Sequence, residues 1–182
     1  MCFAETMSKE SPGNIPDFTT PFVVSAKKAK KRARSSGGIL VYTKPSLRQH
    51  VKMLKGSDST LWLRIDSENV GLHLKKSLFC YFCYIKPYSR RDLSETAFNQ
   101  LENEITEYIR EGEVLLCGDF NAWTGGLTDY LSLDEIGQTF SDCPIPNYYT
   151  PDLNLPRNYL DKQSNINGEN LLRYANLLIY GC

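Results

Sequence analysis

No stretch of this sequence is long and apolar enough to cross a bilayer. The longest apolar run, Leu78 to Ile85, is far shorter than the roughly 20 residues that a membrane-spanning helix needs. The first residues, MCFAETMSKESPG, also lack the apolar core of a secretory signal. We therefore expect no membrane partner, and a nuclear or cytoplasmic location.

The sequence has no excess of either charge. It carries 21 Lys and Arg against 21 Asp and Glu, a formal net charge of zero. The field of the whole molecule thus does not indicate a nucleic-acid partner, but the charge is unevenly placed. Residues 27–34 read KKAKKRAR, and this run has two interpretations. It is either a DNA-facing loop that releases counterions from phosphate, or a solvated surface loop that looks like a nuclear localisation signal.

Metal-binding cysteine pairs are also lacking. Cys80 and Cys83 form a CxxC, but the six cysteines contain no second pair at similar spacing, as a zinc site requires. Residues three apart on a strand also point to opposite faces. We therefore interpret both cysteines as small core residues, with reduced thiols because no export signal precedes them.

What is present is the composition of a folded domain. The chain has 182 residues, 41% of them apolar and 23% charged, which is typical of one globular domain. Periodicity predicts strands interleaved with helices, without internal repeats, and hence an α/β or α+β sandwich. The predicted strands are residues 2–5, 39–42, 61–66, 78–85 and 114–117, and the predicted helices follow residues 92 and 171. Residues 7–26 and the basic stretch 26–36 are predicted to be loops.

The most informative motif, Gly118 to Asn121 (GDFN), stands where an apolar strand ends. Polar groups at the carboxyl ends of strands face the crevice in which such sheets bind ligands. Asp119 can position or deprotonate a water, and Asn121 can donate a hydrogen bond to a phosphate oxygen. The same residue types are common in turns, so these four residues alone are equally consistent with an ordinary turn.

Two further residues stand at predicted strand ends. Glu5 follows the first strand, and a single carboxylate suits Mg²⁺, which keeps waters and phosphate oxygens as its other ligands. Tyr84 lies near the end of the apolar strand, where a phenol can donate to a phosphate. Taken alone, such a glutamate is more often a surface acid and such a tyrosine more often a core residue.

Together the motifs resemble the endonuclease/exonuclease/phosphatase superfamily, and most closely the endonucleases of LINE-type (non-LTR) retrotransposons. The similar segments occur in order over almost the whole chain. They are Glu5-Thr6, Arg34 to Ile39 (RSSGGI), Tyr84 to Ser89 (YIKPYS), Gly118 to Asn121 (GDFN) and Arg157 to Gly168 (RNYLDKQSNING). The resemblance implies the superfamily's two-sheet α/β sandwich.

The resemblance also implies roles. Glu5 would hold Mg²⁺ (or Mn²⁺), Tyr84 would contact the scissile phosphate, Asp119 would orient or activate the attacking water, and Asn121 would bind the phosphate and transition state. The partner would be DNA, and a reverse transcriptase domain is expected in the parent element. The loop before the double glycine lies near the substrate in this family, which favours DNA contact. Its basic residues are Lys27, Lys28, Lys30, Lys31, Arg32 and Arg34.

Parts of the family pattern are missing. Such domains begin with an earlier strand that carries an active-site Asn, and they end with Ser-x-x-Asp and Ser-Asp-His motifs. His50 and His73 have neither context, and we assign neither to catalysis. The expectation is one partial domain over residues 1–182, truncated at both ends and inactive as it stands. The alternatives are a non-catalytic remnant that binds nucleic acid weakly through its basic loop, and a phosphatase of the same superfamily.

Overall fold

The computed structural model describes residues 1–7, 13–28, 35–67, 75–88, 90–127 and 162–180. The chain forms two compact units. The first contains residues 1–86 and 103–120, and the second contains residues 87–102 and 121–182. Within the described ranges, no helix combines the length and apolarity needed to span a membrane.

A three-stranded antiparallel sheet opens the first unit. Its order is β1-β5-β2, with β1 at Cys2–Ala4, β5 at Ile39–Val41 and β2 at Phe22–Val24. Strands β1 and β5 confirm two predictions, whereas β2 falls in a segment predicted to be loop. That prediction was wrong because three residues are too few for a periodic signal, and pairing with β5 decides their conformation.

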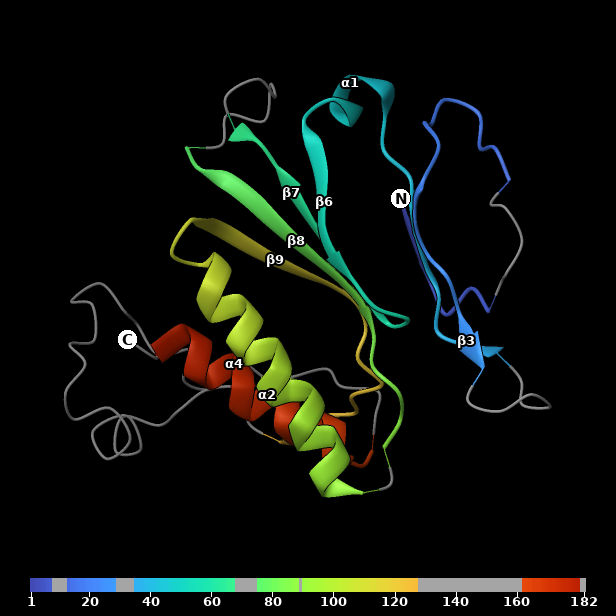
Figure 1. Cartoon of the computed structure of the whole chain (residues 1–182). Coiled ribbons are helices and arrows are strands. Elements are labelled where there is room, and N and C mark those ends of the chain that lie inside the picture. The colour runs from blue at the N-terminus through green and yellow to red at the C-terminus, as the bar shows by residue number, and fades with distance from the viewer. Residues whose placement is uncertain (8–12, 29–34, 68–74, 89, 128–161, 181–182) are drawn as a thin grey trace. The chain divides into compact units, whose positions relative to one another are not determined.

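The second sheet of this unit has the order β6-β7-β8-β9 (Figure 1). Its strands are β6 (Val51–Gly56), β7 (Thr60–Ile65), β8 (Ser77–Tyr84) and β9 (Gly112–Asp119). The first three run antiparallel and β9 runs parallel to β8, after helix α2 (Arg91–Tyr108). The predicted strands over β7, β8 and β9 are confirmed. Strand β6 was not predicted. All its residues after Val51 are exposed, so its sequence is not selected for the apolar alternation that reveals a strand.

The core of the first unit lies between these two sheets. Both contribute to one cluster of buried side chains, so the fold is a mixed α/β structure with two packed sheets, as the sequence predicts at this coarse level. The members are Phe22, Val24, Ile39 and Val41 from the small sheet and Val51, Leu61, Leu63 and Cys80 from the large one.

The opposite face of the large sheet carries aromatic side chains against the end of α2. The Tyr108 ring stacks on Phe79 at 4.9 Å between centroids and lies 4.7 Å from Trp62. The indole of Trp62 donates to Oε2 of Glu104 at 2.8 Å. A covered sheet is apolar on both faces, which explains the continuous apolar run in β8. Burial of Cys80 and Cys83 agrees with their interpretation as core residues.

The basic stretch is not entirely a loop. Lys27–Lys28 form β3, which pairs antiparallel with β4 (Ser35–Ser36) in a two-stranded ribbon. The prediction of a loop over residues 26–36 was therefore wrong at its two ends. Lys30, Lys31, Arg32 and Arg34 lie outside the described residues. A short helix, α1 (Pro45–Arg48), leads into β6.

The second unit contains the first part of α2, the segment Asn121–Leu127 and helix α4 (Ile166–Tyr180). Helix α4 confirms the predicted final helix. Polar side chains join it to α2: the Ser94 hydroxyl donates to Oδ1 of Asn167 at 2.7 Å and accepts from Nδ2 of Asn170 at 2.9 Å. All three side chains are buried.

Candidate functional site

Tyr84 and Asp119 lie opposite each other at the ends of neighbouring strands. They are the last register pair of β8 and β9, and the backbone N–H of Ile85 donates to the carbonyl of Asp119 at 2.8 Å. Because the two strands are parallel, their carboxyl ends meet at one edge of the sheet. Asp119 is exposed, whereas Tyr84 is 8% exposed. The edge therefore presents a solvent-accessible carboxylate beside a largely buried phenol.

Gly118 keeps these two strands close. Its φ is +146°, and a Cβ at this position would stand 2.2 Å from the carbonyl oxygen of Cys83. No side chain fits there without moving backbone, so the glycine of GDFN is required by the packing. Burial raises the pKa of the Cys83 thiol, and the nearby carboxylate of Asp119 raises it further.

Glu5 stands directly after β1 in a left-handed backbone conformation, with φ +52°. The next residues are fixed by the double glycine: Thr6 N–H donates to the Gly38 carbonyl at 3.1 Å, and Met7 N–H donates to the Gly37 carbonyl at 3.0 Å. A Cβ on Gly38 would lie 2.5 Å from the Thr6 hydroxyl oxygen. The Glu-Thr segment and the double glycine, far apart in sequence, therefore meet in the fold.

Strand β1 also contacts the strands that carry Tyr84 and Asp119. It packs against β8 and β9. Burial raises the pKa of the Cys2 thiol, and nearby Cys117, two residues before Asp119, raises it further. Glu5 therefore follows a strand that packs against β8 and β9, and these are the two strands that end at Tyr84 and Asp119.

Asn121 belongs to the second unit. It is half-buried, with a left-handed φ of +47°, and its carbonyl accepts a hydrogen bond from Nδ2 of Asn165 at 2.9 Å. Among the predicted site residues, Tyr84 and Asp119 are paired directly and Glu5 follows a neighbouring strand. Asn121 is held by a different part of the chain.

The predicted Mg²⁺ needs only a few ligands from the protein. No cluster of three His, Cys, Asp or Glu side chains that could hold a metal occurs in the described ranges. Mg²⁺ does not require one, since it is usually bound by one or two carboxylates while waters and phosphate oxygens complete its shell. The half-exposed Glu5 fits that chemistry as a single ligand.

His50 lies at the wrong end of the large sheet to join this edge. It precedes Val51, which pairs with Ile65, and Ile65 pairs with Leu78 near the start of β8. Tyr84 ends the same strand of eight residues, so the two ends are roughly 20 Å apart at about 3.3 Å per residue. His50 is half-buried, and His73 lies outside the described residues.

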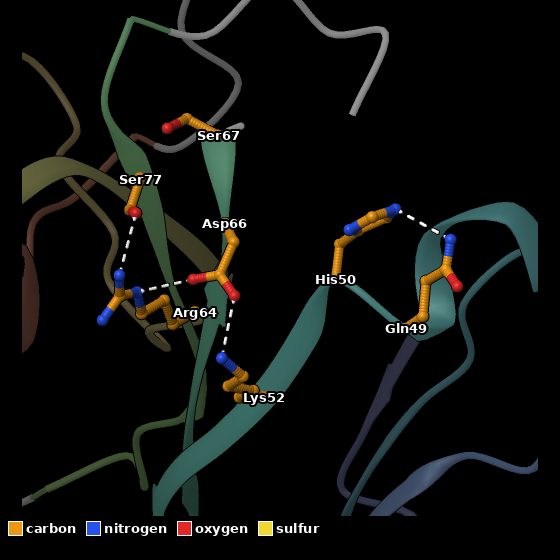
Figure 2. Close-up of a pocket in the computed structure, with 7 residues that line it drawn as sticks. All are labelled: Gln49, His50, Lys52, Arg64, Asp66, Ser67 and Ser77. Carbon is orange, nitrogen blue, oxygen red and sulfur yellow. Dashed lines mark hydrogen bonds and ion pairs between the residues drawn. The ribbon is translucent and has the colours of Figure 1, made fainter. Parts of the chain in front are cut away.

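A polar hollow of about 760 Å³ surrounds His50 at that far end (Figure 2). Its two cations are already engaged: Lys52 Nζ lies 3.0 Å and Arg64 Nε 2.9 Å from the carboxylate of Asp66. The hydrogen bond from Lys52 is the main cause that lowers the Asp66 pKa. His50 points away from them to Gln49 at 3.0 Å. The single carboxylate of Asp66 offsets only one of these two positive charges, so the pairings reduce the charge that would attract a phosphate without removing it.

Sequence reasoning missed the role of Asn165. The only sequence signal there is the similarity of residues 157–168 to a family pattern, and residues 157–161 lie outside the described residues. Oδ1 of Asn165 accepts from the backbone N–H of Gly168 at 2.8 Å and of Trp123 at 3.0 Å. An asparagine three residues before a helical N–H is a recognisable helix cap, but its second partner is visible only in the fold.

Comparison of the sequence with protein-family models and with curated proteins, and of the structure with solved structures, found no match.

Proposed function

We propose that this chain is part of a Mg²⁺-dependent (or Mn²⁺-dependent) endonuclease domain of the endonuclease/exonuclease/phosphatase type, similar to those of LINE-type retrotransposons. The reaction is hydrolysis of a DNA phosphodiester. The proposal includes the superfamily's sandwich as the fold and a reverse transcriptase domain in the parent element.

The observation that carries the proposal is that motifs distant in sequence meet in pairs. Tyr84 pairs with Asp119 in the register of β8 and β9, and Thr6 contacts Gly38. Unrelated turns would have no reason to combine in this way, whereas the parts of one active site must be assembled from separate strands.

The chemistry of the edge suits phosphodiester hydrolysis. The exposed carboxylate of Asp119 orients the attacking water, and Tyr84 donates its phenolic hydrogen bond to the phosphate. Glu5 would hold the metal, which neutralises developing charge on the phosphoryl oxygens when bound. Asn121 donates to a phosphate oxygen from the segment that follows Asp119.

This set lacks the histidine that the family pairs with an aspartate. His50 is excluded because it lies at the far end of the sheet. We therefore expect the 182-residue chain to nick plasmid DNA at most in traces, since removing one member of a cooperating set typically costs several powers of ten.

A plasmid-nicking assay with Mg²⁺ tests the proposal. We expect nicking from a chimera that adds the family-typical strands at both ends, and its loss on Asp119→Ala. The matched control is Asp58→Ala, in the turn between β6 and β7. A chimera that folds and does not nick overturns the proposal, and vigorous nicking by the 182-residue chain overturns the role given to the histidine.

A second candidate is non-catalytic DNA binding through the basic stretch. It is favoured by the ribbon of β3 and β4, which carries the exposed Lys27 at its base. Such binding is weak, sequence-tolerant and salt-sensitive. Changing Lys27, Lys28, Lys30 and Lys31 to Ala should reduce the slope of log affinity against log salt concentration by about 0.9 for each phosphate that the variant no longer neutralises.

Fluorescence anisotropy with a labelled duplex at several salt concentrations measures that slope. The control changes the exposed Lys75, Lys76, Arg110 and Lys162 to Ala, which removes the same charge elsewhere. An equal loss of affinity in both variants would show that only net charge matters.

Release of inorganic phosphate from a small phosphomonoester, without nicking by the chimera, would instead favour a phosphatase.

A further inference from the structure

The segment after β9 leaves the strand through a residue in the left-handed backbone conformation. Asn121 has a φ of +47°, in the left-handed region that residues with a Cβ rarely adopt. The segment Asn121–Leu127 forms no helix or strand beyond a single bridge between Thr124 and Ser164. Asparagine adopts this region more readily than other residues with a Cβ, and contacts with the surrounding structure fix it further.

Asn165 makes three hydrogen bonds to this segment. Its side-chain Nδ2 donates to the carbonyl of Asn121 at 2.9 Å, and its Oδ1 accepts from Trp123 N–H at 3.0 Å. Its own backbone N–H donates to the Trp123 carbonyl at 3.0 Å. The same Oδ1 accepts from Gly168 N–H at 2.8 Å, so one side chain both caps α4 and holds the segment.

Gly168 brings helix and segment into direct contact. A Cβ here would stand 2.0 Å from the carbonyl oxygen of Trp123, so only glycine fits. The start of α4 is itself fixed, because Asn167 and Asn170 are buried and hydrogen-bonded to Ser94 of α2. Asn165 therefore projects from a rigid base.

We propose that Asn165 is a positioning residue that sets the conformation of Asn121 by holding the backbone on both sides of Ala122, and thereby aims the Asn121 amide at a DNA phosphate. This inference rests on the proposed function. Asn165 itself does not touch the substrate. Its effect on DNA is exerted through Asn121, two residues beyond Asp119.

Two substitutions separate the cap from the hydrogen bonds to the segment. Asn165→Ser keeps a good helix cap but is too short to reach the segment, while Asn165→Asp keeps both acceptor interactions and loses only the donor to Asn121. In both variants α4 and the thermal melt should be preserved. Amide hydrogen exchange at Trp123 should become about tenfold faster in Asn165→Ser and stay nearly unchanged in Asn165→Asp.

The second measurement is binding of a fluorescein-labelled DNA duplex to the 182-residue chain in Mg²⁺. We expect Asn121→Ala and Asn165→Ser each to weaken binding about fivefold to tenfold. The double variant Asn121→Ala/Asn165→Ser should be no weaker than either single one, because both remove the same interaction with DNA. Thr96→Ala, on the exposed surface of α2, is the control.

The outcomes are distinguishable. Unchanged exchange at Trp123 in Asn165→Ser overturns the positioning role. Additive effects on binding in the double variant also overturn it, since Asn165 would then act independently of Asn121. If exchange at Trp123 is faster in Asn165→Ser but Asn121→Ala has no effect on binding, the proposed role of Asn121 at the DNA phosphate is overturned. The conclusion that Asn165 holds the segment then still stands.

Discussion

Each of the two units of this chain is stabilised by a different kind of internal interaction. The first is an apolar sandwich in which Ile39, Leu61 and Trp62 have no exposed surface. The second relies much more on buried amides and a hydroxyl. Of the four buried polar residues among the described ranges, three belong to it, namely Ser94, Asn167 and Asn170.

The two kinds of interaction differ in how precisely the side chains must be placed. Apolar burial is non-directional, so an approximate pattern of side chains suffices to form the first unit. A buried hydrogen-bond network is directional, and each member that loses its partner has a high energetic cost. The second unit should therefore have less stabilisation from its core but a more sharply defined geometry around Asn121.

The largest expected effect is in the first unit. Leu61→Ala removes a fully buried side chain from between the sheets and leaves a cavity. We expect the free energy of unfolding, measured by urea denaturation, to fall by about 2–5 kcal/mol. Leu54→Ala on the exposed edge strand is the control, with little expected change. A decrease as small as the control's would mean that the sheets do not form a close-packed core.

The counterpart in the second unit is Ser94→Ala. The change removes one hydroxyl and leaves the amides of Asn167 and Asn170 without this partner. We expect the free energy of unfolding to fall by about 1–3 kcal/mol in the same measurement, although almost no apolar area changes. Thr96→Ala, on the exposed surface of the same helix, should be nearly neutral. Equal results for the two variants would show that the network contributes nothing.

A smaller, pH-dependent effect should come from Glu104, the one buried charge among the described residues of the first unit. Its carboxylate accepts from Lys55 Nζ at 2.6 Å and from the Trp62 indole at 2.8 Å. The hydrogen bond to Glu104 raises the pKa of Lys55. A raised pKa in the folded state stabilises the protein below the lysine's ordinary pKa, and the contribution is lost as pH rises through the folded value.

Glu104→Gln keeps an acceptor for the indole but removes the charge. We expect the free energy of unfolding to fall by about 0.5–1.5 kcal/mol at neutral pH, because Lys55 is largely exposed. The alkaline decline of stability, followed by thermal melting between neutral pH and pH about 11, should be shallower in the variant. Parallel pH curves for the two proteins would contradict the assignment to Lys55.

The sequence by itself determined the elements with a strong apolar signal. The alternation of Leu61, Leu63 and Ile65 specified one strand, and the continuous run in β8 indicated a strand covered on both faces. Helical spacing located α2 and α4, and the strand before Gly118 was visible from its apolar residues. These patterns are local, and their apolar side chains become buried whichever elements they pack against.

The tertiary structure alone decided the rest. Strand β2 and the ribbon of β3 and β4 consist of two or three residues each, and they exist because a partner strand satisfies their backbone groups. The pairing of Tyr84 with Asp119 depends on the parallel register of β8 and β9, which no local pattern specifies. Asn165 and Asn121 are 44 positions apart in the sequence and are joined by a directional hydrogen bond. This bond forms only after folding has brought the two segments together.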